Sequence, residues 1–263
     1  MESGLSSIHA ATIILEELIL ELGVKKQGHV ALTGDTIVVS NAAQRGAMSL
    51  SMMVELAGIV VKLQETTPGL VWLRGTQNSF CSGGNLREVR TGLYDPDAGK
   101  NMCRAMTVVL DELRRLPTLS IAVVDGPALG GGAELLTAVD LRVATAQAKV
   151  GFVHSTLGVS PGWGGATRLA QIVGRQRSLR WLLTGEVLSG EALVKTGFVD
   201  FYADTIEEAL KEVGAHITKP DAVLQAIKAS LGSWDRPSDH ECRAFGSVWG
   251  AEAHQRALGL SQT

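Results

Sequence analysis

Apolar residues near the N-terminus recur at the spacing of one helical face. They are Ile8, Ala11, Leu15, Leu18 and Leu22. Gly23 follows as a natural end of the helix. Glutamates interrupt the apolar run and no basic segment precedes it, so the pattern is not that of a signal peptide or a membrane span. We expect a helix that docks on the protein's own core or on a second subunit.

Further along, short apolar runs alternate with longer stretches of helical spacing. The predicted strands are a hairpin at 29–40, then 69–75, 119–126, a strand pair within 141–153, and 199–204. The predicted helices are 48–65, 97–116, one that starts within 128–140, 187–195 ended by Gly197, and those after 205. Such alternation indicates an α/β fold in which helices cover the strands. We expect three parts: an N-terminal helical extension (1–26), an α/β core (27–203) and a C-terminal helical region (204–263).

The composition narrows the setting. The chain has 263 residues and a formal net charge of −3, which gives little support to binding of nucleic acid through clustered basic residues. Cys81, Cys103 and Cys242 are odd in number and widely spaced, so no disulfide scheme uses all of them and no zinc or redox motif is present. We expect a cytoplasmic protein without a bound metal. Cys81 as a nucleophile is the less favoured alternative, because no local histidine pattern supports it.

Three glycine-rich junctions stand between predicted strands and helices. They are FCSGGN (80–85), LGGGAE (129–134) and SPGWGGATRL (160–169). None has the residue order of a phosphate-binding loop. A glycine-rich turn that opens a helix leaves main-chain N–H groups without partners. Two such turns could present two amides to one oxygen atom, or they could be tight turns between packed elements. Spacing alone leaves both interpretations open.

The order and spacing of these motifs resemble the crotonase (enoyl-CoA hydratase/isomerase) superfamily. FCSGG, IAVVDGPALGGGAELLTAVDLRVA and GVSPGWGGATRL carry the resemblance, which runs in register from about Val38 to Ala203. It implies a spiral core of ββα units, followed by C-terminal helices that form a trimer, with a homotrimer or hexamer as the assembly. It also implies a coenzyme A thioester as substrate, bound through its carbonyl oxygen.

The resemblance assigns roles to individual positions. The main-chain N–H groups of Ser82 and Gly131 would form an oxyanion hole, and Glu134 would lie beside the α-carbon of the substrate. The further pocket candidates are Cys81, Gly83, Gly130 and Trp163. Trp163 either packs in the core or lines the acyl pocket, and Arg168 is expected to anchor the start of its helix. Asn85 and Gly46 stand where the family usually has Asp and Asn.

One departure from the family changes the expected reaction. Hydratases of this family use two glutamates, and the position of the second is His154 here. Without a pair of acids that share a water molecule, efficient hydration is not expected. The pattern VHSTLGVSPGWGGATRL, and the WG motif at Trp249 and Gly250 near the C-terminus, resemble the ethylmalonyl-CoA decarboxylase branch of the family. The resemblance thus implies decarboxylation of a malonyl-type thioester, with His154 holding the carboxylate or protonating the carbanion.

Alternatives remain open at this stage. The thioester itself is the electron sink, so no organic or metal cofactor is expected; coenzyme A belongs to the substrate, and an acyl carrier protein could replace it. With Glu134 as the sole base, the protein would be an enoyl-thioester isomerase or dehydratase. A non-catalytic binder of CoA thioesters is the third interpretation. Neither nucleic acid nor a membrane is an expected partner.

Overall fold

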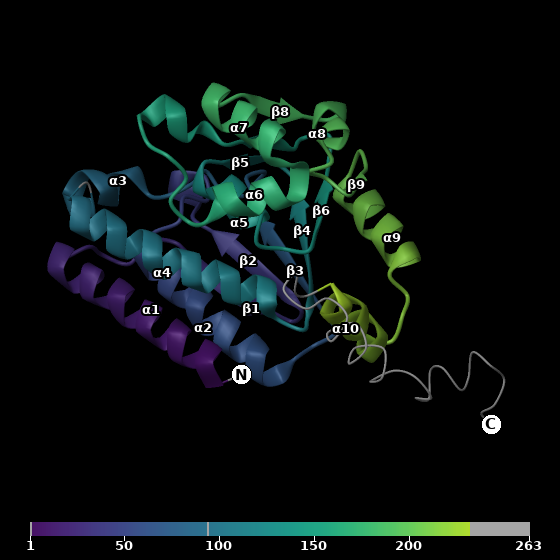
Figure 1. Ribbon diagram of the computed structural model, residues 1–263, viewed down its shortest axis with the longest axis horizontal. Helices are drawn as coiled ribbons and strands as arrows, with labels where there is room; N and C mark the ends of the chain where they lie inside the picture. The colour runs from purple at the N-terminus through teal and green to yellow at the C-terminus, as the bar shows by residue number, and fades with distance from the viewer. Residues whose placement is uncertain (1, 94, 232–263) are drawn as a thin grey trace.

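The computed structural model of the chain describes residues 2–93 and 95–231 (Figure 1). The strands are β1 (His29–Thr33), β2 (Thr36–Ser40), β3 (Leu70–Gly75), β4 (Leu119–Val124), β5 (Pro127–Leu129), β6 (Leu141–Ala144), β7 (Lys149–Gly151), β8 (Val187–Ser189) and β9 (Phe201–Tyr202). The longer helices are α1 (Glu2–Leu22), α2 (Leu50–Thr66), α4 (Pro96–Arg115), α6 (Gly165–Val173), α7 (Arg175–Thr184), α9 (Ile206–His216) and α10 (Asp221–Ser230). The short helical segments are η1 (Ala42–Gln44), α3 (Leu86–Glu88), η2 (Val89–Leu93), α5 (Gly131–Leu136), η3 (Val153–Leu157) and α8 (Glu191–Thr196).

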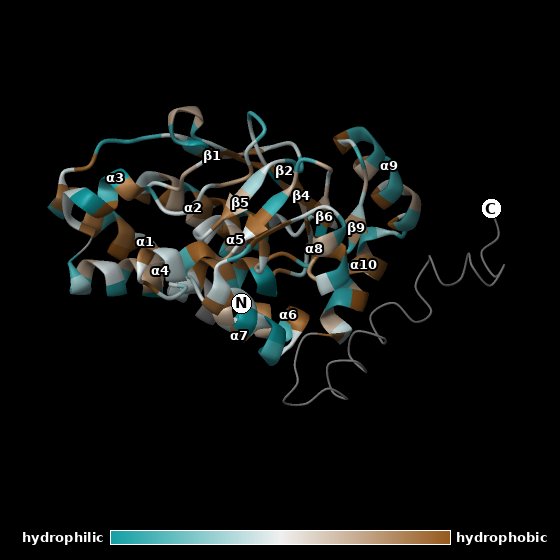
Figure 2. Cartoon of the chain, turned by 90° about the horizontal axis from the view of Figure 1, so that it is seen from above, coloured by the Kyte–Doolittle hydropathy of each residue, from teal (hydrophilic) through white to brown (hydrophobic). Residues whose placement is uncertain are grey.

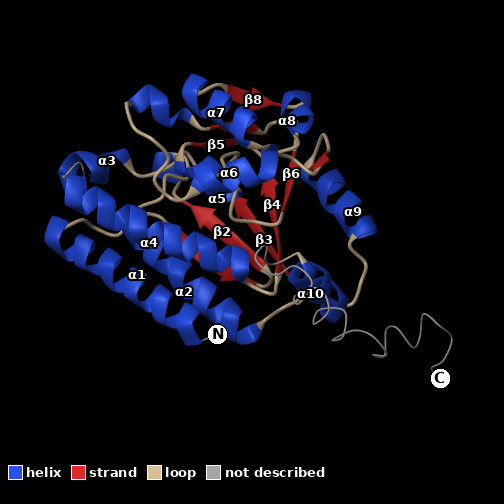
Figure 3. Cartoon of the chain, in the orientation of Figure 1, coloured by secondary structure: helices blue, strands red, loops and turns tan. Residues whose placement is uncertain are grey.

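Two sheets organise these elements. The larger has the strand order β1-β2-β3-β4-β6-β9, in which only the β1–β2 hairpin is antiparallel. The smaller has the order β5-β7-β8, with β5 and β7 parallel. Figure 3 shows the strands surrounded by helices. The chain therefore has the α/β architecture predicted from its alternating pattern, with a mostly parallel main sheet. The helices α9 and α10 follow the last strand in the sequence.

Both faces of the main sheet are covered, which explains the nearly continuous apolar sequence of β4. Ala122 and Val124 point into the larger hydrophobic cluster, which also contains buried residues of α1, α2 and α4. Ile121 belongs to a second cluster on the other face, where Ala209 and Val213 of α9 are buried. In Figure 2 the helices carry both apolar and polar residues, as expected for elements with one buried side.

The N-terminal helix packs on the protein's own core. Its buried residues are Ile8, Ala11, Leu15 and Leu18, four of the five positions predicted for the apolar face. They contribute to the larger cluster together with residues of α2 and α4, and Figure 1 shows these three helices side by side. The predicted helix is thus confirmed, including its end before Gly23. Of the two docking sites that the sequence left open, the structure shows the intramolecular one.

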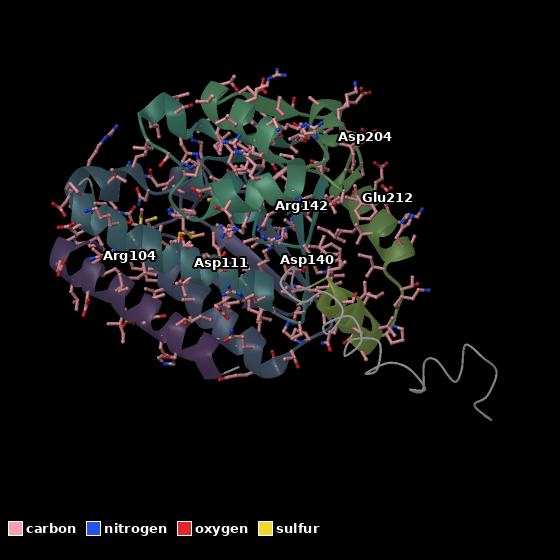
Figure 4. All side chains as sticks on the ribbon, viewed as in Figure 1. Arg104, Asp111, Asp140, Arg142, Asp204 and Glu212 are labelled. Atoms are coloured by element: carbon pink, nitrogen blue, oxygen red, sulfur yellow. The ribbon has the colours of Figure 1, made fainter. Side chains whose placement is uncertain are left out.

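An ion pair connects α10 to the main sheet. The Lys228 ammonium binds Asp140 Oδ2 at 2.7 Å and donates to the Thr118 carbonyl at 2.8 Å. The same Asp140 oxygen accepts from the main-chain N–H and the hydroxyl of Ser120 at the start of β4, and Asp140 is labelled in Figure 4. Burial lowers the pKa of Lys228, and the Asp140 charge opposes that shift.

The C-terminal WG motif at Trp249 and Gly250 lies outside the described residues.

Two details of the sequence prediction are wrong. Residues 141–153 do not form a strand pair: β6 joins the main sheet beside β4, whereas β7 joins β5 and β8 in the smaller sheet. Residues 187–195 are not one helix, because Val187–Ser189 pair with β7 and α8 begins only at Glu191. Gly190, at φ 52°, separates the strand from the helix. Gly197 ends α8 in the left-handed conformation, as predicted.

Within residues 2–93 and 95–231, no helix is both long enough and apolar enough to cross a membrane.

The packing of α1 gives a first test. Leu15 is fully buried and Leu20 is 80% exposed on the same helix. We expect Leu15→Ala to lower the free energy of unfolding by about 2–5 kcal/mol, because the truncation leaves a cavity. Leu20→Ala should change it by less than about 0.5 kcal/mol. Urea unfolding of both variants measures the difference. Equal midpoints would show that α1 does not belong to the folded core in solution.

Candidate active site

The first glycine-rich turn is held between two segments of main chain. The N–H groups of Phe80 and Cys81 both donate to the Pro127 carbonyl, at 3.0 and 3.1 Å, and the Cys81 carbonyl accepts from Leu129 N at 2.9 Å. On the other side, Met48 N donates to the Gly83 carbonyl at 2.8 Å. The turn that carries Ser82 is therefore fixed by main-chain contacts, and side chains add to these: the Ser82 hydroxyl donates to the Gln44 carbonyl at 2.9 Å.

The second glycine-rich turn lies directly against the first. A Cβ atom on Gly132 would be 2.0 Å from the Cys81 carbonyl oxygen, and one on Gly83, at φ +100°, would be 3.3 Å from Gly131 N. Side chains at Gly132 and Gly83 would thus force the turns apart. No hydrogen bond within the described part of the chain uses the main-chain N–H of Ser82 or Gly131. The structure therefore brings together the two glycine-rich turns that carry Ser82 and Gly131, the residues that the sequence paired.

Glu134 is the most fully coordinated side chain of the site. It lies in α5 and is 1% exposed. Its Oε1 atom accepts from Gly162 N at 3.1 Å and lies 2.9 Å from His154 Nε2. Its Oε2 atom accepts from Trp163 N at 2.8 Å and from Gly165 N at 2.9 Å. These four contacts use the acceptor sites of both oxygens, so the carboxylate has no lone pair left over for a water molecule.

His154 contacts Glu134 and follows a residue of an aromatic cluster in the sequence. It lies in η3, two residues after Phe152, whose ring meets Trp181 and Phe198 edge to face at centroid distances of 5.1 and 6.0 Å. His154 is 8% exposed. Because Nε2 faces a carboxylate, the contact assigns the hydrogen to Nε2. The other ring nitrogen, Nδ1, is buried and has no hydrogen-bond partner among the described residues.

Arg168 holds the turn that wraps around Glu134. Its guanidinium donates to the carbonyl of Trp163, to Thr137 Oγ1 at 3.0 Å and to Asp111 Oδ1 at 2.8 Å; Asp111 on α4 is labelled in Figure 4. Burial lowers the pKa of Arg168, and the Asp111 charge opposes that shift. The expected anchoring of the start of α6 by Arg168 is confirmed.

Trp163 is packed against both glycine-rich turns. Its indole atoms would lie 2.5–2.9 Å from a Cβ on Gly131 and 3.8 Å from a Cβ on Gly84. A side chain at Gly131 would therefore displace the indole. The structure thus places the Trp163 indole against Gly131, the residue that follows Gly130 in the second turn.

Two predicted positions have structural explanations. Cys81 is fully buried, its thiol contacts the Gly83 carbonyl at 3.8 Å, and burial raises its pKa to about 11. Such a thiol is a poor nucleophile. Asn85 is buried as well: its Oδ1 accepts from Arg87 N at 3.0 Å and caps α3, while its amide donates to Gln27 Oε1. Both side chains therefore form buried contacts that stabilise the first glycine-rich turn and the start of α3.

The comparisons with known proteins agree with this geometry. Residues 36–245 match the family described as enoyl-CoA hydratase/isomerase, and the chain belongs to that family. Among solved structures, an enoyl-CoA hydratase from Bacillus anthracis superposes with a TM-score of 0.79 at 25% identity, covering 89% of this chain and 95% of that one. An enoyl-CoA hydratase from Thermoplasma volcanium gives a TM-score of 0.80 at 24% identity, over 91% and 98% of the two chains.

Two curated relatives that are similar in sequence are called decarboxylases rather than hydratases. The chain is 34% identical over 234 residues to a human protein called ethylmalonyl-CoA decarboxylase, covering 84% of this chain and 76% of that protein. It is 38% identical over 236 residues to the Danio rerio protein of the same name, with 84% and 78% covered. The sequence resemblance to this branch is therefore confirmed.

The sequence did not reveal which groups bind Glu134. The amides of Gly162, Trp163 and Gly165 lie 28 to 31 positions further along the chain. A glycine-rich turn before α6 indicated free N–H groups, but nothing in the spacing indicated that they close on a glutamate of α5. The partner of Arg168 on α4 was equally hidden, because it lies 57 positions away.

The coordination of Glu134 predicts the effect of its amide isostere. Glu134→Gln would turn an NH₂ group toward main-chain N–H donors, and we expect the free energy of unfolding to fall by about 1–3 kcal/mol. Glu65→Gln, on an exposed residue of α2, is the matched control and should leave it unchanged. Urea unfolding of the two variants makes the comparison. If both unfold at the wild-type urea concentration, Glu134 is not held by these contacts in solution.

Proposed function

We propose that the protein is a cofactor-free decarboxylase of short malonyl-type CoA thioesters, such as ethylmalonyl-CoA or methylmalonyl-CoA. The observation that carries the proposal is the state of the two side chains beside the glycine-rich turns. Where a hydratase needs two free carboxylates, this site has His154 and a Glu134 whose oxygens are already occupied. The names of the relatives at 34–38% identity support the same reaction.

The main-chain amides of Ser82 and Gly131 would supply the electrostatic part of catalysis. The bond between the α-carbon and the free carboxylate breaks, CO₂ leaves, and the electron pair moves through the α-carbon onto the thioester oxygen. Two N–H donors stabilise this enolate more than the neutral carbonyl of the substrate. Each donor in such a hole contributes roughly 3–4 kcal/mol. The adjacent positions of the two turns support this assignment.

His154 would act on the carboxylate and on the proton. An imidazole next to a carboxylate side chain can carry positive charge, hold the departing carboxylate out of the thioester plane, and afterwards protonate the α-carbon. A buried ring nitrogen without a partner costs about 1–3 kcal/mol, and a polar group of the substrate at Nδ1 would remove that cost. Glu134 would then be a positioning residue, which orients the imidazole through Nε2.

Two other functions are less well supported. An enoyl-thioester isomerase or dehydratase would need Glu134 as a free base, and its four contacts oppose that role. A non-catalytic thioester binder would not need the imidazole at this position. The proposal includes acyl-CoA as substrate, with a carrier-protein thioester as the variant form, and a homotrimer or hexamer as the assembly.

A carbon dioxide assay tests the proposal. We expect release of CO₂ from ethylmalonyl- or methylmalonyl-CoA, with little hydration of crotonyl-CoA by the same preparation. His154→Gln should lower kcat by about 10²–10⁴-fold, since it removes the acid–base group. His29→Gln, on the exposed start of β1, is the matched control and should keep wild-type activity. No CO₂ from malonyl-, methylmalonyl- or ethylmalonyl-CoA, from a folded protein, would refute the proposal.

A further inference from the structure

The two consecutive glycines of the second turn face different side chains. A Cβ on Gly130 would lie 3.9 Å from His154 Nε2 and from Val153 Cγ2, whereas a Cβ on Gly131 would lie 2.5 Å from two carbons of the Trp163 indole. One short turn therefore has the imidazole and Val153 near one glycine and the large indole against the next. His154 and Trp163 are both buried, at 8% and 3% exposure.

The indole of Trp163 has little freedom to move away from this turn. The main chain of Trp163 is held on both sides, because its N–H donates to Glu134 Oε2 at 2.8 Å and its carbonyl accepts from Arg168. The ring itself approaches Gly131 and Gly84 of the two turns. Since Glu134 and Arg168 are buried too, the indole forms a fixed wall rather than a mobile cover.

We infer that Trp163 determines which α-alkyl group the site accepts and on which side of the α-carbon it lies. The inference rests on the proposed function and deepens it. With the thioester oxygen at the amides of Ser82 and Gly131, the α-carbon is held between the indole and the imidazole. Its alkyl group then lies toward Trp163 and its carboxylate toward His154. The reverse arrangement would bury a carboxylate against an apolar ring without a partner.

This arrangement has two consequences for selectivity. Only one configuration of the α-carbon presents the carboxylate to His154 while the alkyl group faces Trp163, so the site decarboxylates one epimer. The wall also limits the length of the alkyl group, because the indole already fills the space beside Gly131 and Gly84. We therefore expect the site to accept a methyl or ethyl group in preference to longer chains.

Replacement of the indole tests both consequences. The measurement is kcat/KM for CO₂ release from methyl-, ethyl- and butylmalonyl-CoA. We expect wild type to disfavour the butyl ester by ~10-fold or more, the range in which pockets discriminate by chain length. Trp163→Leu should reduce or reverse that ratio, and Trp163→Phe should give an intermediate ratio. With racemic ethylmalonyl-CoA, wild type should rapidly consume one epimer only, and Trp163→Leu should consume both.

Trp72→Leu is the matched control. Trp72 is a half-buried tryptophan of β3 that packs on the second hydrophobic cluster, so its loss should leave the chain-length ratio unchanged. Near-ultraviolet circular dichroism checks that each variant is folded; if Trp163→Leu does not fold, the ratio for Trp163→Phe decides. A folded variant that keeps the wild-type ratio and epimer preference overturns this inference alone. No CO₂ from any ester with wild type refutes the proposed function instead, and this inference with it.

Discussion

The carboxylate of Glu134 connects the parts of the site that lie far apart in the sequence. It belongs to α5, yet it accepts three main-chain N–H groups from the turn before α6 and contacts the imidazole of η3. A buried carboxylate is costly unless each oxygen finds donors, and here the fold supplies four. The position of Trp163 and the orientation of His154 both follow from these contacts. Gly165 has to be a glycine for the same reason, since a Cβ there would lie 2.4 Å from Glu134 Cγ.

The candidate site combines main-chain amides with buried side chains. The amides of Ser82 and Gly131 come from turns that are fixed by hydrogen bonds to neighbouring main chain, and their contact requires glycine at positions 83 and 132. Main-chain donors of this kind need no reorganisation when charge develops on a substrate oxygen. Under the proposed function, His154 near Gly130 and Trp163 against Gly131 would supply the polar and the apolar neighbour of the substrate. Under that function, His154 in place of an acidic side chain would change the reaction, while the two amides would keep the role of an oxyanion hole.

Much of the fold could be predicted from local patterns. The apolar face of α1, the β1–β2 hairpin and the end of α8 at Gly197 follow from periodicity and turn chemistry. The distribution of strands between two sheets could not, because β6 and β7 are short neighbours in the sequence and their pairing partners lie elsewhere in the chain. Likewise, the motifs identified Glu134 and His154, but their contact and the three amides on Glu134 depend on how distant turns meet in space. Trp163 is a similar case: the sequence showed the motif that contains it, but not the contact of its indole with Gly131.

A crystal structure with a non-hydrolysable malonyl-CoA analogue tests the central claim most directly. The account predicts the thioester oxygen within about 2.7–3.1 Å of both Ser82 N and Gly131 N, the distance range of an oxyanion hole. It also predicts that Glu134 remains bound to the amides of Gly162, Trp163 and Gly165. A thioester oxygen that contacts neither amide, with Glu134 turned away from that loop toward the ligand, would contradict the account.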